Sequence, residues 1–562
     1  MQRIVERAVA LLLLAAHAAI QARLAWMESD TIDEPGHVAS ALTYLQRGDF
    51  RLYNVNPPLP RLAQGVLLLG AGFDASRSPD PGKHGDRMEF IAGAGFAHAN
   101  ADRWREALFR ARLGTLLFSL LGGLLLWRAG DALFGKPCGL AALFLWCADP
   151  SVLAHGHLAT PDLPAAVVAL AAALAHLAYL RDPTASRAAF SAVLLGAALL
   201  CKFTLLLLLP LWGVALFFTV RRVPAWHAGL ALLLALLVIN VGYLFQGTGR
   251  RVESFRMLSS KFAWLAPETI DTLHGPANAH GGTWLGALPV PLPAPFIEGM
   301  DLQARDFDRY AADRSRFFFA GAWHEGGRWW YYLYGIAVKW PLALFALLLL
   351  VRQRPPLLLV LVPLATLALV SSQTGMNKHI RYVLPALPFA VLIAAASAKT
   401  APRWLLVPLL VWAGWSGLRA SVDPLAWFNE LAGGPRGGIR HLAGSNLDWG
   451  QGRWRLRDWL EAHPDFRPVS IAVYGMGTNP LIGLPAGLAP QTPTAGRFAV
   501  GVRHLQDDLR SVQDAEGVSH EVKPGGYSWL LRLQPVATAG DSVWIFDVSE
   551  EEAERLRREA EE

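Results

Sequence analysis

Long apolar runs constrain the fold of this chain more than any other feature. The hydrocarbon core of a bilayer is about 30 Å thick, and a helix needs roughly 20 residues to cross it. Of the 562 residues, 53% are of the types AVILMFWYC and only 17% are charged, whereas a water-soluble domain has roughly 25% charged residues. The sequence therefore predicts a polytopic α-helical membrane protein. About eleven runs are candidate membrane helices, at residues 6–26, 106–127, 136–154, 163–180, 187–202, 203–220, 226–246, 331–351, 355–373, 381–398 and 403–419.

The charge distribution argues against a nucleic-acid partner. The formal net charge is +6, but the basic residues stand between apolar runs and do not form the basic stripe that a nucleic-acid surface requires. The three cysteines, Cys138, Cys147 and Cys201, all lie inside apolar runs, where a thiol packs more often than it reacts. We therefore expect membrane lipids as partners, no nucleic acid, and no disulfide framework.

The loops between the runs predict an orientation, because short cytoplasmic loops retain Lys and Arg. The first run follows Arg3 and Arg7 but precedes no convincing cleavage site, so we expect a retained helix and not a signal peptide. This places the N-terminus inside and the C-terminal region outside. The short inside loops then carry basic residues, namely Arg128, Lys136, Arg181, Arg187, Arg221, Arg222, Arg352, Arg354, Lys399 and Arg403, whereas the short outside turn at 148–162 carries no Lys or Arg.

The predicted membrane domain comprises residues 1–419 and includes two large outer loops. The first outer loop, 27–105, contains two expected surface helices at 35–47 and 58–69. The second of these helices is strongly apolar on one side and suited to the membrane interface. The large outer loop, 247–330, is rich in Pro, Gly and aromatic residues. Both loops are expected on the same outer face.

The pattern changes in the C-terminal part of the chain. Residues 469–474 and 498–502 have the composition of strands, and 453–462 has the pattern of an amphipathic helix. Residues 420–548 therefore predict a small α/β domain on the outer face. Residues 549–562 are rich in charge and are expected to form a solvated helical tail.

An acidic motif, SDTIDEPGH at residues 29–37, follows the first apolar run. Its carboxylates are Asp30, Asp33 and Glu34. Because Pro35 suits the first turn of a helix, one carboxylate could simply cap free N–H groups. A cap leaves the other two unexplained, so a carboxylate that accepts a proton from a substrate hydroxyl is an equally open alternative. We expect the helix N-terminus to lower the pKa of Asp33 and keep it ionised.

A second acidic motif, HGHLATPD at residues 155–162, enters the fourth apolar run from the outside. Thr160 and Pro161 are typical of a helix start, and Asp162 could merely interact with the helix dipole. Two histidines without a fixed spacing are weak evidence for a metal site, so a divalent metal ion remains only a possible cofactor. Asp162 is a catalytic candidate because the topology brings it to the same face as Asp33.

Basic residues at the outer helix ends form a third candidate group. Lys202, Lys378 and Arg381 break the inside bias of positive charge, and an ionisable group at membrane depth is costly unless it is paired or used. Each could be only an interface anchor. Together they would form a cationic, aromatic-walled pocket suited to a lipid phosphate, with Tyr331, Tyr332, Lys339 and His379 as further members.

Nine short segments resemble one family of membrane enzymes, in order and over nearly the whole chain. They are DEPGH (33–37), YLQRGDF (44–50), NPPL (56–59), ATPDLP (159–164), WYY (330–332), KWP (339–341), RYVLPALP (381–388), FNELAGGP (428–435) and SNLDWGQ (445–451). The chain is similar to the polyprenyl-phosphate-sugar-dependent glycosyltransferases of the C-type fold. This superfamily includes the protein O-mannosyltransferases and the aminoarabinose transferases.

The resemblance implies a bacterial inner-membrane enzyme with a periplasmic C-terminal domain. It implies that Asp33 is the base for the acceptor hydroxyl, with Glu34 beside it, and that Asp162 is the acidic residue of the second outer loop. It associates the lipid phosphate with Lys202, Lys339 and Arg381. The chain has fewer predicted spans than the aminoarabinose transferases and no evident trefoil insertion, so the acceptor, a lipid, glycan or protein, stays open.

These features predict an inverting glycosyltransferase that moves a sugar from a polyprenyl-phosphate carrier to an acceptor hydroxyl. One rival is a transporter or lipid flippase whose outer carboxylates bind a proton or cation, but such proteins usually contain repeated halves, and none is visible here. Another rival is a non-catalytic lipid- or glycan-binding protein whose C-terminal domain is the functional part. The Gly-Met-Gly at 475–477 is too weak a signal for a nucleotide site.

Overall fold

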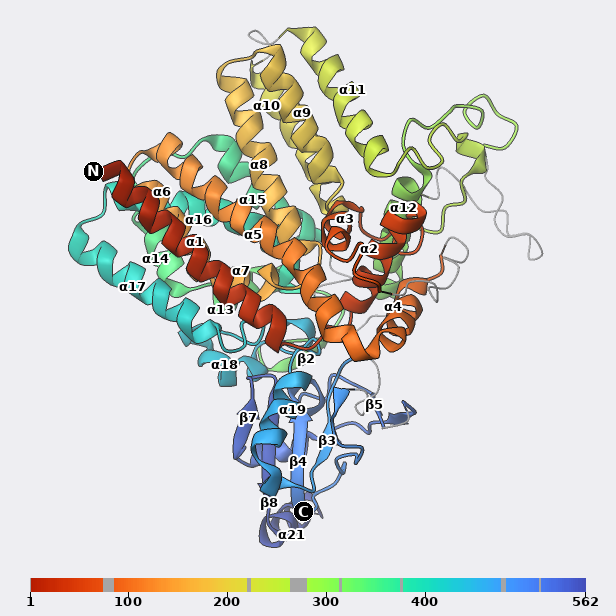
Figure 1. Cartoon of the computed structure of the whole chain (residues 1–562), viewed down its shortest axis with the longest axis vertical. Coiled ribbons are helices and arrows are strands. Elements are labelled where there is room, and N and C mark those ends of the chain that lie inside the picture. Colours follow the sequence, from red (N-terminus) through yellow and green to blue (C-terminus); the bar gives the residue numbers. More distant parts are fainter. Residues whose placement is uncertain are drawn as a thin grey trace.

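The computed structural model describes residues 2–73, 85–219, 224–262, 280–312, 316–373, 378–476, 482–514 and 517–561. Apolar helices form a bundle, shorter helices cover one side of it, and a small domain with a mixed sheet stands at one end (Figure 1). The predicted fold class, a helical membrane protein with a small C-terminal α/β domain, is confirmed. Two basic loop residues used for the orientation, Arg221 and Arg222, lie outside the described residues.

Every predicted apolar run coincides with helical structure. Within the described residues, five helical segments are long and apolar enough to cross a membrane by themselves. They include the helices α1 (Gln2–Met27), α5 (Trp104–Phe134), α8 (Asp162–Arg181), α11 (Ala225–Gly242) and α16 (Leu387–Ala395) with its preceding η7 (Ile380–Ala386).

Two further runs are bent pairs, which raises the number of candidate spans to seven. Helices α6 (Cys138–Ala148) and α7 (Pro150–Gly156) meet at 61°, and α13 (Tyr331–Lys339) and α14 (Leu342–Leu349) meet at 101°. A proline stands at each break, and proline cannot donate a helix hydrogen bond. The remaining runs form shorter or less apolar helices, α9 (Ala185–Leu199), η2 (Phe203–Leu207) with α10 (Leu208–Thr219), α15 (Leu357–Ser372) and α17 (Arg403–Ala420).

Helix α8 lies at the centre of the bundle and begins at the candidate residue Asp162. It packs against α5, α9 and η7, and its alanines at 165, 166, 169, 172 and 173 are fully buried. Small side chains allow helices to approach closely in a membrane protein. The start of α8 is therefore held firmly between the neighbouring helices.

The first outer loop folds onto the bundle as α2 (Glu34–Arg47), α3 (Leu59–Val66) and α4 (Met88–Ala99). The prediction that 35–47 forms a surface helix is wrong, because α2 is buried from Glu34 to Tyr44. Two glycines permit this burial: a Cβ atom on Gly93 of α4 would lie only 2.4 Å from the backbone nitrogen of Gly36 of α2. The tight contact fixes the N-terminal end of α2.

The large outer loop contains α12 (Ala294–Ala312), and a hairpin of β1 (Arg316–Phe319) and β2 (Ala322–Glu325) follows it. Short elements complete the described chain, namely η1 (Ala101–Arg103), η4 (Val252–Ser254), η8 (Ala396–Lys399), η9 (Glu430–Ala432), α18 (Gly434–Gly437), η10 (Gly438–Arg440), η11 (Gly444–Asn446), η12 (Pro464–Phe466) and η14 (Ser528–Arg532).

The C-terminal domain contains a four-stranded sheet in the order β3-β4-β8-β7. Strands β3 (Ser470–Ala472) and β4 (Gly496–Gly501) pair in parallel, while β8 (Val543–Val548) pairs antiparallel with both β4 and β7 (Ala537–Ala539). The predicted strands and the predicted helix, α19 (Arg453–Ala462), are present. Helix α20 (Val502–Leu505) follows β4, and a separate hairpin consists of β5 (Ser511–Gln513) and β6 (Ser519–Glu521).

The last residues form a helix, α21 (Glu550–Glu561), as predicted, but they are not a solvated tail. Ala553 is fully buried and Leu556 is 1% exposed, and both join a core cluster with Phe546 and Val548 of β8. The charged residues occupy the other faces of the helix. The helix has a single narrow apolar stripe and many charged residues, so its composition alone predicted a solvated tail.

Buried polar contacts attach the C-terminal domain to the loop that follows α1. Arg453 of α19 donates to both oxygens of Asp30, at 3.0 and 3.1 Å. The backbone nitrogen of Ile32 donates to the carbonyl of Trp449 at 3.0 Å. Because these contacts hold the loop at Asp30 and Ile32, the C-terminal domain helps to fix the position of the next acidic residue, Asp33.

Candidate active site

Asp33 is the N-cap residue of α2, but its side chain does not cap the helix. The carboxylate points instead toward Arg381 of η7, whose Nη2 lies 3.4 Å from Oδ2. The neighbouring Glu34 accepts from the backbone nitrogen of Thr31 at 2.9 Å. The capping alternative therefore does not account for the Asp33 side chain.

Four charged side chains of alternating sign meet at this point. Arg381 also approaches Asp162, with 3.6 Å between Nε and Oδ2. Lys202 donates to the other oxygen of Asp162 at 2.5 Å. Asp162, Lys202 and Arg381 are all nearly buried, whereas 21% of the Asp33 side chain is exposed. The break between α9 and η2 brings Lys202 to the site.

Arg381 is oriented by contacts on several sides. Its guanidinium carbon lies 3.9 Å from the centre of the Trp449 ring, and Nη1 donates to the hydroxyl of Ser445 at 2.9 Å. The same hydroxyl contacts His379 Nδ1 at 2.7 Å. Stacking on an indole and ion pairs to two carboxylates hold the planar fork in one orientation. The C-terminal part of the chain thus supplies both Ser445 and Trp449 to the site.

Burial raises the pKa of the Asp33 carboxyl above its usual value, and the nearby Asp162 acts in the same direction, while Arg381 opposes both. The sequence predicted the opposite shift from the helix N-terminus. That prediction is wrong because removal of water from the carboxylate outweighs the helix dipole at this position. A raised pKa makes Asp33 a better proton acceptor than an exposed aspartate.

Glu34 occupies a closed, buried network behind the site. Both of its oxygens accept from Arg112, at 2.8 and 2.7 Å, and the backbone nitrogen of Ala159 donates to Oε1 at 2.7 Å. Burial alone would raise its pKa, but Arg112 and the backbone donors lower it overall. Glu34 lines neither cavity of the site, which favours a supporting role over the catalytic role that the sequence suggested.

Two cavities meet at Asp33 and Arg381. The outer cavity, of about 330 Å³, extends toward the C-terminal domain, and the inner cavity, of about 230 Å³, extends toward Asp162 and Lys202. Asp33 and Arg381 therefore stand in a common wall with access to both spaces. The residues that line both cavities are Asp33, Phe90, His379, Arg381 and Trp449.

The other predicted residues fall into two groups. Tyr331, Lys378 and His379 line the outer cavity, whereas Tyr332 lines a separate, very small cavity beside Lys202. Burial and the charge of Arg381 hold the pKa of His379 well below its usual value. Lys339 lies outside both cavities: it donates to the carbonyls of Leu425 and Trp427, at 2.7 and 2.6 Å.

The structure adds residues that sequence reasoning did not select. Arg87 lines the inner cavity and pairs with Glu89 and Asp306. Arg503 of α20 lines the outer cavity, pairs with Asp508 at 2.6 Å, and lies 4.0 Å from the centre of the Tyr474 ring. No local motif marks these arginines, because their proximity to the site depends on how the outer loops and the C-terminal domain dock.

Among the described residues, no three His, Cys, Asp or Glu side chains lie close enough together to hold a metal ion. His157 is instead 2.8 Å from Glu28 through Nε2 and 2.6 Å from the carbonyl of Leu153 through Nδ1. These contacts explain one of the two histidines that suggested a metal.

The family of dolichyl-phosphate-mannose-protein mannosyltransferases matches residues 105–243 of this chain. This stretch has the signature of that family. It runs from α5 to just beyond α11 and contains Asp162 and Lys202. Over this stretch, the resemblance to polyprenyl-phosphate-sugar-dependent glycosyltransferases that was inferred from the short segments is confirmed.

Two crystal structures of ArnT from Cupriavidus metallidurans are similar to this chain. The apo structure is 16% identical in sequence to this chain and superposes with a TM-score of 0.44. The match covers 81% of this chain and 69% of the ArnT chain. The ArnT structure bound to undecaprenyl phosphate is 13% identical in sequence to this chain and superposes with a TM-score of 0.46. The match covers 95% of this chain and 97% of the ArnT chain. A search of the curated proteins found no match.

Proposed function

We propose that this protein is an inverting glycosyltransferase that moves a sugar from a polyprenyl-phosphate carrier to an acceptor hydroxyl. One observation carries the proposal: a half-buried carboxylate, Asp33, stands in the common wall of two cavities beside the cationic Arg381. A transfer reaction between two substrates needs a proton acceptor and a cationic group at the point where the substrates meet. The family match supports a lipid-phosphate sugar donor.

The inner cavity is the proposed donor site. Lys202 and Arg381 face it across Asp162, and Arg87 lines it from the first outer loop. Arginine presents a planar fork that matches phosphate oxygens, and lysine adds a point charge. Because Lys202 stands at a break between membrane helices, the lipid tail can remain in hydrocarbon while the phosphate contacts these cations.

Asp33 is the proposed base. It accepts the proton of the acceptor hydroxyl while the hydroxyl oxygen forms a bond to the anomeric carbon. The bond from that carbon to the phosphate oxygen breaks, and the electron pair leaves with the phosphate. Arg381 and Lys202 stabilise the departing charge. The raised pKa of Asp33 favours proton transfer, and one displacement without a covalent glycosyl-enzyme inverts the configuration.

Asp162, Glu34 and Lys339 are proposed to position other groups. Asp162 holds Lys202 and Arg381 in place through its two oxygens. Glu34 and Arg112 fix the start of α2. Lys339 fixes the segment at 425–427 through its carbonyls.

The outer cavity is the proposed acceptor site, formed partly by the C-terminal domain through Arg503 and Tyr474. Lipid, glycan and protein hydroxyls all remain candidates for the acceptor. The family resemblance supports a location in a bacterial inner membrane. The loop charges support an orientation with the N-terminus in the cytoplasm and this site on the periplasmic face. A reporter fused after residue 562 that is active only in the cytoplasm would contradict this orientation.

The test is a transfer assay with the purified full chain and a panel of polyprenyl-phosphate sugars. The expected result is release of free polyprenyl phosphate that depends on cell-envelope extract and is lost in Asp33→Asn. Mass spectrometry of envelope glycans and lipids from cells with and without the protein then identifies the acceptor. Movement of intact carrier across vesicles without cleavage of the sugar would favour the transporter alternative, and binding without either outcome would favour a non-catalytic protein.

A further inference from the structure

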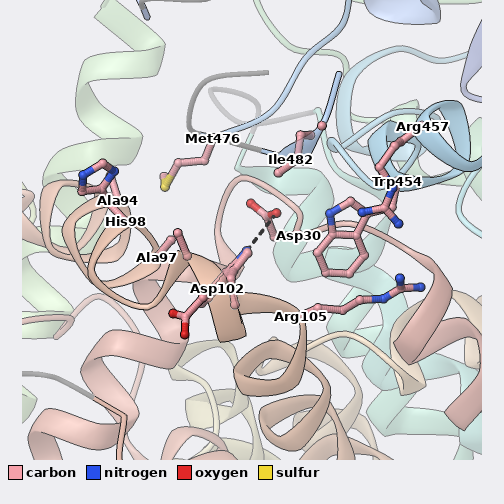
Figure 2. A pocket seen from close by; sticks show the side chains of 13 residues that line it. Asp30, Ala94, Ala97, His98, Asp102, Arg105, Trp454, Arg457, Met476 and Ile482 are labelled. Carbon is pink, nitrogen blue, oxygen red and sulfur yellow. Dashed lines mark hydrogen bonds between the residues drawn. The ribbon is translucent and has the colours of Figure 1, made fainter. Parts of the chain in front are cut away.

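A cavity of about 550 Å³ lies between the first outer loop and the C-terminal domain, away from the proposed active site (Figure 2). Its volume is within the range of small-molecule sites. It shares no lining residue with the inner or outer cavity. Its lining includes Asp30, Ala94, Ala97, Arg105, Trp454 and Arg457.

An ion pair separates this cavity from the active site. The carboxylate of Asp30 is 2% exposed and accepts from Arg453 at 3.0 Å and from the indole nitrogen of Trp104 at 3.3 Å. Asp33, three residues further along the same loop, faces the other side. A ligand in this cavity would therefore not occupy the donor or acceptor site.

Most of the wall is apolar. Ala94 and Ala97 of α4 provide one side, and Trp454 of α19 and Ile482 provide another (Figure 2). Covering such an apolar surface with hydrocarbon removes it from water, which has a favourable free energy. The wall suits the aliphatic part of a ligand.

A cationic group stands at one end of this wall. The guanidinium of Arg105 lies between two indole rings, 4.6 Å from the centre of Trp26 and 5.0 Å from that of Trp454. Its Nε donates to the carbonyl of Trp26 at 2.9 Å. Among the described residues, Arg105 forms no ion pair with a carboxylate, which leaves its charge available for an anion.

A second arginine lies at the same end. Arg457 and Arg105 stand on either side of Trp454, whereas His98 and Asp102 lie at the opposite end (Figure 2). Arg457 is 2.6 Å from Asp458 and 3.7 Å from Glu461, both on its own helix. The arginine end therefore combines one paired and one unpaired guanidinium.

Two candidate membrane spans end close to this arginine end. The candidate spans in α1 and α5 are Ile4–Met27 and Ala101–Phe134, so Trp26 and Arg105 both stand within the terminal turns of a span. Trp26 is 44% exposed, and tryptophan is enriched at membrane interfaces. A membrane lipid could reach the cavity from this side without leaving the bilayer.

We propose that this cavity binds an anionic membrane lipid, with its phosphate between Arg105 and Arg457 and its aliphatic part along the alanine and tryptophan wall. Charge complementarity and the position at the end of two spans select an anionic lipid over a neutral soluble ligand. The site is separate from the donor site. A lipid held there would join α4, α5 and α19, and with them the C-terminal domain, to the membrane domain.

The test measures saturable binding of phosphatidylglycerol to the purified full chain by native mass spectrometry. Phosphatidylcholine with the same acyl chains and inorganic phosphate are the comparison probes. Arg105→Gln removes the unpaired charge, and its control is Arg110→Gln, on the same helix but paired with Glu106. A hydrogen bond between a guanidinium and a phosphate is charge-assisted, so Arg105→Gln should weaken phosphatidylglycerol binding at least about tenfold.

A second variant keeps the charges and fills the space. Ala94→Trp places an indole in the cavity, and its control is Ile91→Trp, at a position 61% exposed on the same helix and outside the cavity. We expect Ala94→Trp to abolish phosphatidylglycerol binding, Ile91→Trp to preserve it, and the active-site variant Arg381→Gln to preserve it as well. All variants are compared by thermal unfolding.

Three results would overturn the proposal. The first is equal binding of phosphatidylglycerol and phosphatidylcholine, because the net negative charge of the headgroup would then not contribute to binding. The second is binding of inorganic phosphate as tight as that of the lipid, because the apolar wall would then contribute nothing. The third is loss of phosphatidylglycerol binding in Arg381→Gln but not in Ala94→Trp, because the lipid would then occupy the donor site.

Discussion

Replacement of Asp33 by asparagine tests the proposed mechanism most directly. Asparagine has nearly the same shape but cannot accept the proton of the acceptor hydroxyl. A general base contributes about 10²–10⁴-fold in rate, which corresponds to roughly 3–5 kcal/mol of activation free energy. We therefore expect Asp33→Asn to lose at least about 10²-fold in turnover.

The same substitution should leave the fold nearly unchanged. The ion pair between Asp33 and Arg381 is long, at 3.4 Å, and 21% of the Asp33 side chain is exposed. Arg381 keeps its contacts with Asp162, Ser445 and Trp449. A partly exposed ion pair of this kind stabilises a protein by about 1 kcal/mol or less, so the thermal unfolding of Asp33→Asn should be close to that of the wild type.

The assay is single-turnover release of polyprenyl phosphate, with donor binding measured separately. Asp49→Asn is the matched control, because Asp49 lies in the same outer loop, pairs with the half-exposed Arg51 and lines neither cavity of the site. Normal turnover in Asp33→Asn, together with an inactive but folded Glu34→Gln or Asp30→Asn, would assign the base to another carboxylate. Normal turnover in all three variants would refute the proposed mechanism.

Four further results are expected. Glu34→Gln should lower the free energy of unfolding by about 3–5 kcal/mol, because it leaves Arg112 buried without its partner; a Glu34→Gln protein with wild-type unfolding would disprove the supporting role. Arg381→Lys should weaken donor binding about tenfold in a lipid-binding assay, since lysine cannot form a fork; unchanged binding would reduce Arg381 to an anchor. Because the pKa of Asp33 is raised, turnover should fall as the pH drops, with a midpoint above that of an ordinary aspartate, and a pH–rate profile of wild type lacking this limb would contradict the assignment. Arg503→Gln should raise the KM for the acceptor and leave donor binding unchanged; steady-state kinetics showing the reverse would place the acceptor elsewhere.

The secondary structure and membrane helices were largely predictable from the sequence, because they depend on local composition and periodicity. Apolar runs near the length of a bilayer form helices regardless of their partners, and even the break at Lys202 coincides with the polar interruption of a leucine-rich run. Packing was not predictable. The burial of α2 depends on a contact between Gly36 and Gly93 that no local pattern reveals, and the apolar stripe of α21 requires the surface of β8.

The candidate site divides in the same way. The sequence determined which outer segments carry carboxylates and cations, since the positions of Asp33, Asp162, Lys202 and Arg381 in the chain follow from motifs and loop charge. Only the tertiary structure decided their roles. Asp33 and Glu34 are adjacent in the chain, but one faces two cavities and the other is enclosed by Arg112. The direction of the Asp33 pKa shift depends on which groups surround its carboxylate. Arg503 lines the outer cavity because the C-terminal domain packs against the outer loops. Both features therefore depend on contacts between residues far apart in the sequence.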